Sequence, residues 1–229
     1  MHHTTAYRLR VSFLAVVTLL MTGAVARAQS ARVFDPDSEP FGTPFRQWTA
    51  QWWQHVLSFP LDGNPLFDET GALCMLGQRG PVWLLYGSTG GTVTRTCSVP
   101  SGKALLFPVI NQVDFNTTNQ TARELRAEVA PCMDAVTTLS VEVDGRPVRD
   151  LDAEFRVRSA VFEVTIPPNS FVPPGTYSPA IDDGFWVMLK PLSVGSHTVH
   201  IRAARDGCPV DPFALDVLYH LTIVPVTLK

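Results

Sequence analysis

The stretch LDVLYHLTIV (residues 215–224) decides the fold class of this chain. Val217, Tyr219, Leu221 and Ile223 recur at every second position. A two-residue period is typical of a β-strand that buries one face and exposes the other. We therefore expect a long strand near the end of the chain, with these four side chains turned inward.

The same period recurs upstream. LSVEVDG (residues 139–145) alternates and then reaches Asp144-Gly145, a dipeptide that favours a tight hairpin turn. HTVHIRA (residues 197–203) places His197 on the inward side with Val199 and Ile201, which predicts a hydrogen-bonded histidine at the edge of the core. We expect residues 197–203 to pair with the last strand, and two further hairpins from residues 82–86 with 92–96 and 185–189 with 197–203.

Nineteen prolines and fifteen glycines divide the chain into short pieces. Short alternating strands with frequent turns favour two packed antiparallel sheets. We predict a mostly β protein, an immunoglobulin-like or jelly-roll-type β-sandwich with an N-terminal Trp-rich helix and one further short helix. The segment from Phe185 to Val224, a hairpin followed by a long last strand, resembles the ending of many immunoglobulin-like extracellular modules.

The Trp-rich helix is predicted from its boundaries and its apolar stripe. Thr43 is a suitable N-cap, Pro44 suits the first helical position, and Pro60 would end the helix. We expect the helix to bury Trp48 and Trp52 and to leave Trp53 more exposed. The stripe has helical spacing and comprises Phe45, Trp48, Trp52, Val56 and Phe59. The second helix is expected over residues 121–130, before Pro131.

The first 28 residues read as a cleavable export signal. Arg8 and Arg10 precede a short apolar run, residues 11–22, and Ala26-Arg27-Ala28 offers a small-x-small cleavage site. We expect a signal peptide over residues 1–28 and a mature chain that begins at Gln29. Residues 29–229 would form one β-sandwich domain, with residues 29–60 as its lead-in and capping helix, in a secreted or periplasmic location.

The charge balance bears on the class of partner. Three of the 18 basic residues precede Gln29 and all 21 acidic residues follow it, so the mature chain would carry a formal net charge of about −6. Binding to nucleic acid needs a basic field, so a nucleic-acid partner is not expected. No second apolar run reaches the ~20 residues that a spanning helix needs, so no membrane span is expected after cleavage.

Export would place the four cysteines in a compartment where disulfide bonds persist. Four cysteines allow three pairings, and sequence spacing does not choose among them rigorously. We expect Cys74–Cys97, because these residues flank the hairpin expected over residues 82–96, and Cys132–Cys208 as the remaining pair.

Four residues stand out as candidate ligand contacts. Trp53 lies off the apolar stripe of its helix, and Trp186 follows Asp182-Asp183-Gly184. Exposed indoles can stack on sugars, and paired carboxylates in loops can hold ligands or perform acid–base catalysis. The alternative is that the tryptophans fill the core and that Asp-Asp-Gly is ordinary turn chemistry.

His200 and His220 form a candidate metal pair. If the connection between their strands is centred near Val210, the two histidines lie opposite each other on the outward face. Two imidazoles could then share copper or zinc, although the sequence supplies no third ligand. The alternative is two unrelated outward histidines, and we expect no cofactor.

The combined features favour an exported, disulfide-stabilised binding module, with a glycan or another envelope component as its partner. One alternative is a secreted hydrolase that uses loop carboxylates such as Asp182 and Asp183. Another is a structural or metal-binding envelope protein. The sequence identifies no catalytic residue and leaves both enzymatic activity and oligomeric state open.

Overall fold

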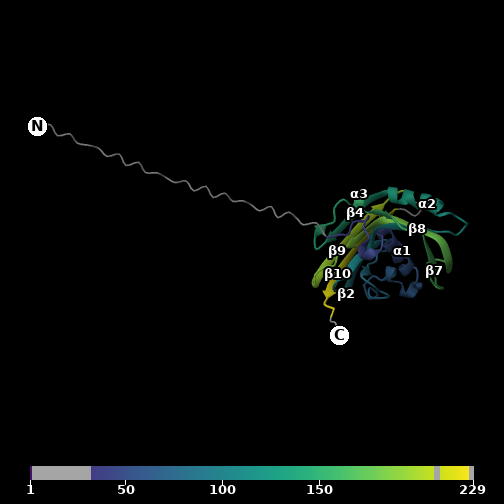
Figure 1. Ribbon diagram of the computed structural model, residues 1–229, viewed down its shortest axis with the longest axis horizontal. Coiled ribbons are helices and arrows are strands. Elements are labelled where there is room, and N and C mark those ends of the chain that lie inside the picture. Colours follow the sequence, from purple (N-terminus) through teal and green to yellow (C-terminus); the bar gives the residue numbers. More distant parts are fainter. Residues whose placement is uncertain (2–31, 209–211, 227–229) are drawn as a thin grey trace.

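Two five-stranded sheets form the body of the protein in the computed structural model, which describes residue 1, residues 32–208 and residues 212–226 (Figure 1). The first sheet has the order β1-β3-β8-β6, and β7 also pairs with β8; its strands are β1 (Val82–Leu84), β3 (Ala104–Phe115), β8 (Gly175–Leu189), β6 (Arg156–Arg158) and β7 (Phe162–Ile166). The second sheet has the order β2-β10-β9-β4-β5; its strands are β2 (Gly91–Pro100), β10 (Phe213–Val224), β9 (Gly195–Arg205), β4 (Val136–Val143) and β5 (Arg146–Pro147).

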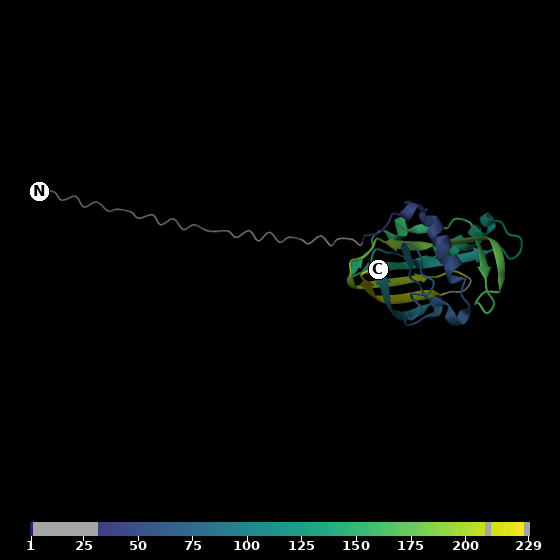
Figure 2. The ribbon, with the colours of Figure 1, turned by 60° about the horizontal axis from the view of Figure 1, so that its bottom comes forward.

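Helices cover the first sheet. Helix α1 packs against β6, β7 and β8, and Figure 2 shows it lying across the strands; helix α2 packs against β8 and β3. The helical segments are α1 (Phe45–Val56), α2 (Ala122–Asp134), the single turn α3 (Leu151–Glu154) and the 3₁₀ turns η1 (Pro40–Gly42), η2 (Leu61–Gly63) and η3 (Pro65–Phe67).

The strand order confirms the predicted β-sandwich of immunoglobulin-like type. In an immunoglobulin domain, strands B, E and D share one sheet and strands C, F and G share the other. Here β3, β8 and β6 are neighbours in the first sheet, and β4, β9 and β10 are neighbours in the second. Strand β2 runs parallel to the last strand, β10, at the edge of the second sheet.

The two sheets differ in how many faces they bury, and this difference is visible in the sequence. Leu105 and Phe107 of β3 pack in the core between the sheets, whereas Leu106 packs in a second core beneath α1. The first sheet is therefore apolar on both faces, and residues 104–110 are all buried. The second sheet buries one face only, so β10 alternates between buried and more exposed positions, as its sequence predicts.

Two of the expected strand pairings are confirmed. Strands β9 and β10 pair antiparallel, with Val217, Tyr219, Leu221 and Ile223 buried. Strands β4 and β5 form the hairpin expected at Asp144-Gly145, where both residues adopt positive φ, at 51° and 70°. Positive φ at both central positions is the geometry of a type I′ turn, which matches the twist of a hairpin.

The other two expected hairpins are wrong. Strand β1 lies in the first sheet and pairs with β3, whereas β2 lies in the second sheet and pairs with β10. Strands β8 and β9 likewise lie in different sheets. In both cases the turn residues carry the chain from one sheet to the other, and local alternation does not distinguish a crossing from a hairpin.

Both predicted helices exist, with different boundaries. Helix α1 begins at Phe45 after Pro44, which provides no side-chain cap, so the prediction of Thr43 as the N-cap is wrong. Helix α2 begins after Thr121, which forms a capping box with Glu124, and it continues through Pro131 to Asp134.

The disulfide bonds Cys74–Cys97 and Cys132–Cys208 confirm the expected pairing. The hairpin that motivated the first pair does not exist, and the bond instead ties the loop before β1 to strand β2. Among the described residues, none of the helices combines the length and apolarity needed to cross a membrane. The predicted signal peptide lies outside the described residues, apart from Met1.

Replacing Trp52 should be far more costly than replacing Trp48. Trp52 is 1% exposed and its Nε1 donates to the Leu85 carbonyl oxygen, whereas Trp48 is only partly buried. We expect Trp52→Ala to lower the free energy of unfolding by about 3–5 kcal/mol, the usual cost of truncating a large buried aromatic. Urea denaturation of both variants provides the measurement, and equal losses for Trp48→Ala and Trp52→Ala would contradict this packing.

Candidate ligand-binding pocket

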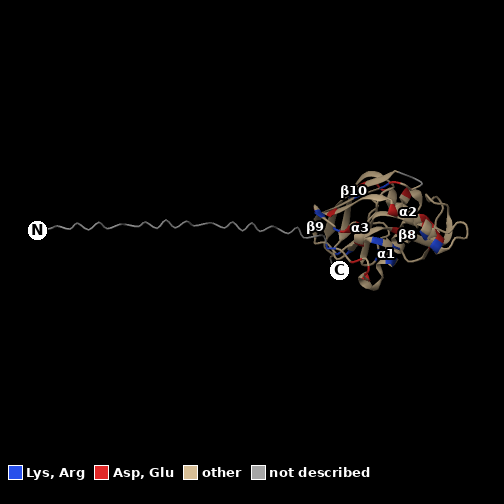
Figure 3. Cartoon of the chain, turned by 90° about the horizontal axis from the view of Figure 1, so that it is seen from above, with Lys and Arg blue, Asp and Glu red and all other residues tan. Residues whose placement is uncertain are grey.

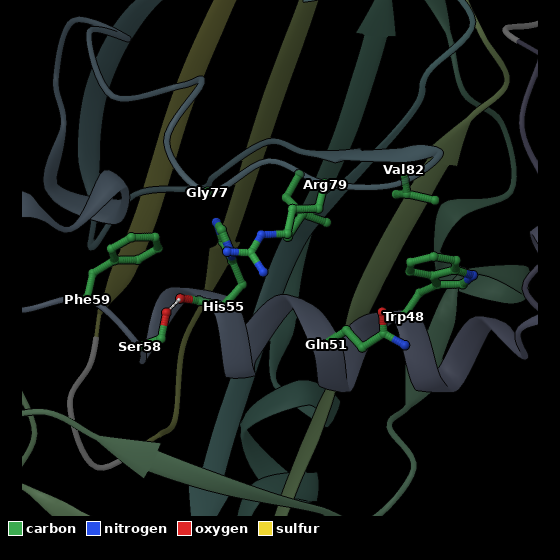
Figure 4. A pocket seen from close by; sticks show the side chains of 9 residues that line it. Trp48, Gln51, His55, Ser58, Phe59, Gly77, Arg79 and Val82 are labelled. Carbon is green, nitrogen blue, oxygen red and sulfur yellow. Dashed lines mark hydrogen bonds between the residues drawn. The ribbon is translucent and has the colours of Figure 1, made fainter.

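A cavity of about 400 Å³ lies between α1 and the loop that precedes β1. We call it the α1 pocket (Figure 4), and it is lined by Trp48, Gln51, His55, Ser58, Phe59, Gly77, Arg79, Val82 and Leu84. Its volume falls within the range of small-molecule sites, about 300–1,000 Å³. Aromatic rings and polar side chains share its wall, which is the usual composition of such sites.

The floor of the pocket comes from one side of α1. Trp48, Gln51 and His55 are spaced by three and four residues, so they lie on one helical face. Trp48 donates its Nε1–H to the Pro40 carbonyl oxygen at 3.0 Å. This hydrogen bond holds the N–H edge of the indole ring in place. Its ring remains partly exposed and lines the cavity.

His55 belongs to a buried network and is not a free base. Its Nε2 lies 2.9 Å from the Tyr86 hydroxyl, and that hydroxyl accepts from the Gln78 amide. His55 and Tyr86 share one hydrogen bond, and the imidazole tautomer decides which of the two side chains donates. Burial lowers the pKa of His55 below 6.5, and the nearby Arg79 charge acts in the same direction.

The roof of the pocket is the loop around Gly77, which adopts φ +65°. A Cβ atom there would lie 2.7 Å from Cε1 of His55 and 3.1 Å from Cζ of Phe59, so both the conformation and the close approach require glycine. Gln78 holds this loop by donating to the backbone oxygens of Cys74 and Leu84. The roof is thus held from both ends and shaped around the His55 ring.

Gln51 and Arg79 are the polar groups left over for a ligand. Neither side chain makes a hydrogen bond or ion pair with any residue in the described part of the chain. Figure 4 shows Gln51 rising from α1 and Arg79 reaching down from the roof toward His55. An amide and a guanidinium without internal partners can hydrogen-bond an occupant of the cavity.

Three of the four predicted ligand contacts meet, but inside the protein. Asp182 accepts from Nε1 of Trp53 at 2.8 Å and from Nε1 of Trp186 at 2.9 Å, and its backbone N–H donates to Ser159. Trp53 is 7% exposed and Trp186 is fully buried, so the expectation that Trp53 is more exposed than Trp48 is wrong. No solvent-facing indole platform exists at these two residues.

Asp183, the fourth predicted contact, lies on the other face of β8. It accepts from Arg156 through both carboxylate oxygens, at 3.0 and 2.9 Å, and it pairs with Arg158. Both aspartates are at most 1% exposed, and the expectation that they lie in a loop is wrong. Gly184 follows them because a Cβ there would lie 2.4 Å from that of Asn111 on β3, so Asp-Asp-Gly reflects close strand packing instead of a turn.

The structure does not place the candidate metal ligands opposite each other. His200 pairs with Leu218 and His220 pairs with Thr198, so the predicted register is wrong by two residues. Strand β9 continues to Arg205 and β10 begins at Phe213, which centres the connection at position 209. His200 instead bonds Asp216 at 2.6 Å, and within residues 32–208 and 212–226 no three His, Cys, Asp or Glu side chains form a metal-binding group.

A Ser-His-Asp sequence of contacts occurs at the start of β9, but its geometry does not activate the serine. Nδ1 of His197 lies 2.7 Å from Asp144, and Nε2 lies 3.3 Å from the Ser193 hydroxyl. The same Nε2 lies closer, at 2.9 Å, to the Ser193 carbonyl oxygen, so Nε2 donates there and cannot accept the hydroxyl proton. This contact confirms His197 as a hydrogen-bonded residue at the edge of the core.

Sequence reasoning missed the residues that build the pocket. Arg79 and Gln51 belong to no motif, and nothing in their spacing indicates that they face each other. The sequence did contain a signal for the buried position of Arg95, which is 2% exposed. Arg95 alternates with Cys97 and Val99 on the inward face of β2. A charged residue on the inward face of a strand marks a site where backbone carbonyl groups must gather.

Comparisons with known proteins identify no family for this chain. No family model matches the sequence, and no curated protein is significantly similar to it. Among solved structures, the cysteine protease inhibitor EhICP2 from Entamoeba histolytica is similar over 62% of this chain and 96% of that chain, with 14% identity and a TM-score of 0.25. PbICP-C in complex with falcipain-2 is similar over 63% of this chain and 100% of that chain, with 12% identity and a TM-score of 0.26. Similarity this weak carries no information about what the chain binds.

Asp182→Asn should destabilise the protein, because an amide cannot accept from both indole N–H groups. One unsatisfied buried donor costs about 1–3 kcal/mol. Burial raises the pKa of Asp182 well above 3.8, so the folded wild type retains a proton that the unfolded chain loses as the pH rises. The contribution of Asp182 to wild-type stability should therefore fall as the pH rises above about 4, and the variant should lack this contribution.

Urea denaturation at pH 4 and pH 7 measures both effects. Asp134→Asn is the matched control, because Asp134 is an exposed carboxylate, 64% accessible, that pairs with Arg156. We expect that control to change stability by less than about 1 kcal/mol. A similar loss in both variants would contradict the special role of Asp182.

His55→Gln should reduce the loss of unfolding free energy that accompanies a fall in pH below 6.5. Because the pKa of His55 is lowered in the folded state, the unfolded chain takes up a proton below pH 6.5 before the folded chain does. Wild-type stability contributed by His55 is thus present above pH 6.5 and is lost as the pH falls. Chemical denaturation between pH 7.5 and 5.5 should show a smaller decline for the variant, and parallel curves would rule out this assignment.

Proposed function

We propose that the mature chain is an exported binding module that holds the end of a glycan in the α1 pocket. The observation that carries this proposal is the partly exposed Trp48 ring, which lines a cavity of about 400 Å³. Gln51 and Arg79 line the same cavity, and neither side chain has a hydrogen bond or ion pair with another described residue. Sugars present an apolar ring face and a rim of hydroxyl groups. An indole face with planar polar groups beside it complements both.

Other features of the chain support this proposal. Two disulfide bonds suit an extracytoplasmic protein, and the N-terminal sequence predicts export. The bonds of His55 and Trp48 fix the walls before any ligand arrives, so little ordering would be needed on binding. The buried carboxylates Asp182 and Asp183 offer little support for the alternative of a hydrolase.

Trp48→Ala should strongly weaken glycan binding by the mature protein on a glycan array. Loss of the stacking face should weaken binding at least tenfold, while the fold survives because Trp48 is only partly buried. Phe171→Ala is the matched control, because it removes a 39% exposed aromatic ring that does not line the α1 pocket. If the wild-type protein binds no glycan, or if the control loses binding equally, this proposal is wrong.

A protein partner is the second candidate, and exposed apolar side chains favour it. Phe67 and Phe171 are 37% and 39% exposed, and their rings meet at 5.2 Å. Leu61 is 44% exposed, and its backbone N–H donates to the carbonyl oxygen of Asn169, two residues before Phe171. Binding to cell extracts separates the candidates, because periodate destroys a glycan partner and a protease destroys a protein partner.

A further inference from the structure

The α1 pocket has an uneven distribution of charge. Arg79 is the one charged side chain among the nine described residues that line it, and none of the nine is acidic. His55, the other titratable group of the wall, is hydrogen-bonded to the Tyr86 hydroxyl. An occupant of this cavity therefore meets one positive charge with no negative charge beside it.

Lys103 carries a second positive charge, which lies near Arg79 in the structure but does not line the pocket. Its Nζ donates to the carbonyl oxygen of Gly80, the residue next to Arg79. Only three lysines occur in the sequence, and acidic residues outnumber basic ones by 21 to 18. Figure 3 shows basic and acidic residues interspersed over much of the molecule, whereas the residues that line the α1 pocket include one arginine and no acidic residue.

The chemistry of these groups selects a carboxylate on a ring. A guanidinium binds a carboxylate through two parallel hydrogen bonds, and Arg79 makes no hydrogen bond or ion pair within the described residues. Gln51 can reach a neighbouring hydroxyl group, and the indole of Trp48 lies along the same helical face. The ligand would thus combine an apolar ring face, hydroxyl groups and one carboxylate.

We propose that the α1 pocket binds an acidic sugar, a uronic acid residue whose carboxylate pairs with Arg79 while its ring stacks on Trp48. The inference rests on the proposed glycan-binding function and specifies its ligand class. Arg79 is the determinant of specificity, because it distinguishes the acidic sugar from its neutral counterpart. Trp48 is the determinant of sugar binding, because its ring would contact the acidic sugar and its neutral counterpart alike.

The test compares trigalacturonate with its methyl ester, which has the same rings and no charge. Isothermal titration of the mature wild-type protein should show about five- to tenfold tighter binding of the acid. Raising sodium chloride from 50 to 500 mM should reduce that preference, because salt screens an exposed ion pair. Arg79→Gln should bind both probes with the affinity of the wild type for the ester, and Arg79→Lys should recover part of the preference.

The controls separate this inference from the proposed function. Trp48→Ala should weaken both probes alike, whereas Arg146→Gln, which removes an exposed arginine outside the pocket, should change neither. Equal wild-type affinity for the acid and the ester would overturn the acidic-sugar inference and leave glycan binding intact. Acid binding that survives Trp48→Ala unchanged would overturn it as simple ion pairing. Tighter binding of a sulfated trisaccharide would overturn the choice of a carboxylate.

Discussion

The placement of α1 depends on one buried acceptor, the carboxyl group of Asp182. Its two oxygens take the indole N–H groups of Trp53 from α1 and Trp186 from β8. The carboxyl group is completely buried, so these bonds replace the water that it loses on folding. The two hydrogen bonds attach α1 to the first sheet at Trp53. The position of the α1 pocket therefore depends on these hydrogen bonds to β8, although no residue of β8 lines the pocket.

Arg95 supplies the corresponding constraint for the loops. Its guanidinium donates to the backbone oxygens of Leu66, Asp68, Tyr86 and Gly87 and to the Tyr219 hydroxyl. These carbonyl groups belong to segments that form no regular ladder, and burial without a donor would make them costly. One side chain thereby positions the residues before and after β1 relative to β10. Tyr86, which completes the His55 network, is among them.

The sequence predictions were correct for strands and turns that local residue patterns determine. They were wrong about which strands pair across the sheets. Period-two alternation correctly located β10 and β9, and Asp144-Gly145 correctly located a tight hairpin turn, which the structure shows to have type I′ geometry. The turn residues between β1 and β2 could not indicate that the chain crosses from one sheet to the other. Asp182-Asp183-Gly184 misled because the glycine that permits close strand packing looks the same in sequence as one that permits a turn.

The candidate site was harder to predict than the fold for a related reason. The sequence singled out Trp53, Trp186 and Asp182, and the structure does bring them together, but as an internal brace. Whether an indole lies inside or outside depends on what covers the sheet, and the helix that covers it is the one that carries Trp53. The pocket itself joins α1 to a loop about 25 residues away, and no periodicity links the two.

The unequal burial of the tryptophans has an optical consequence. All five indoles lie in the described region; Trp52, Trp53, Trp83 and Trp186 are at most 7% exposed, and Trp48 alone is accessible to water. The long-wavelength edge of the intrinsic fluorescence, and the fraction that acrylamide can quench, should therefore come from Trp48. Because that same ring lines the α1 pocket, the protein carries its own unlabelled reporter of occupancy.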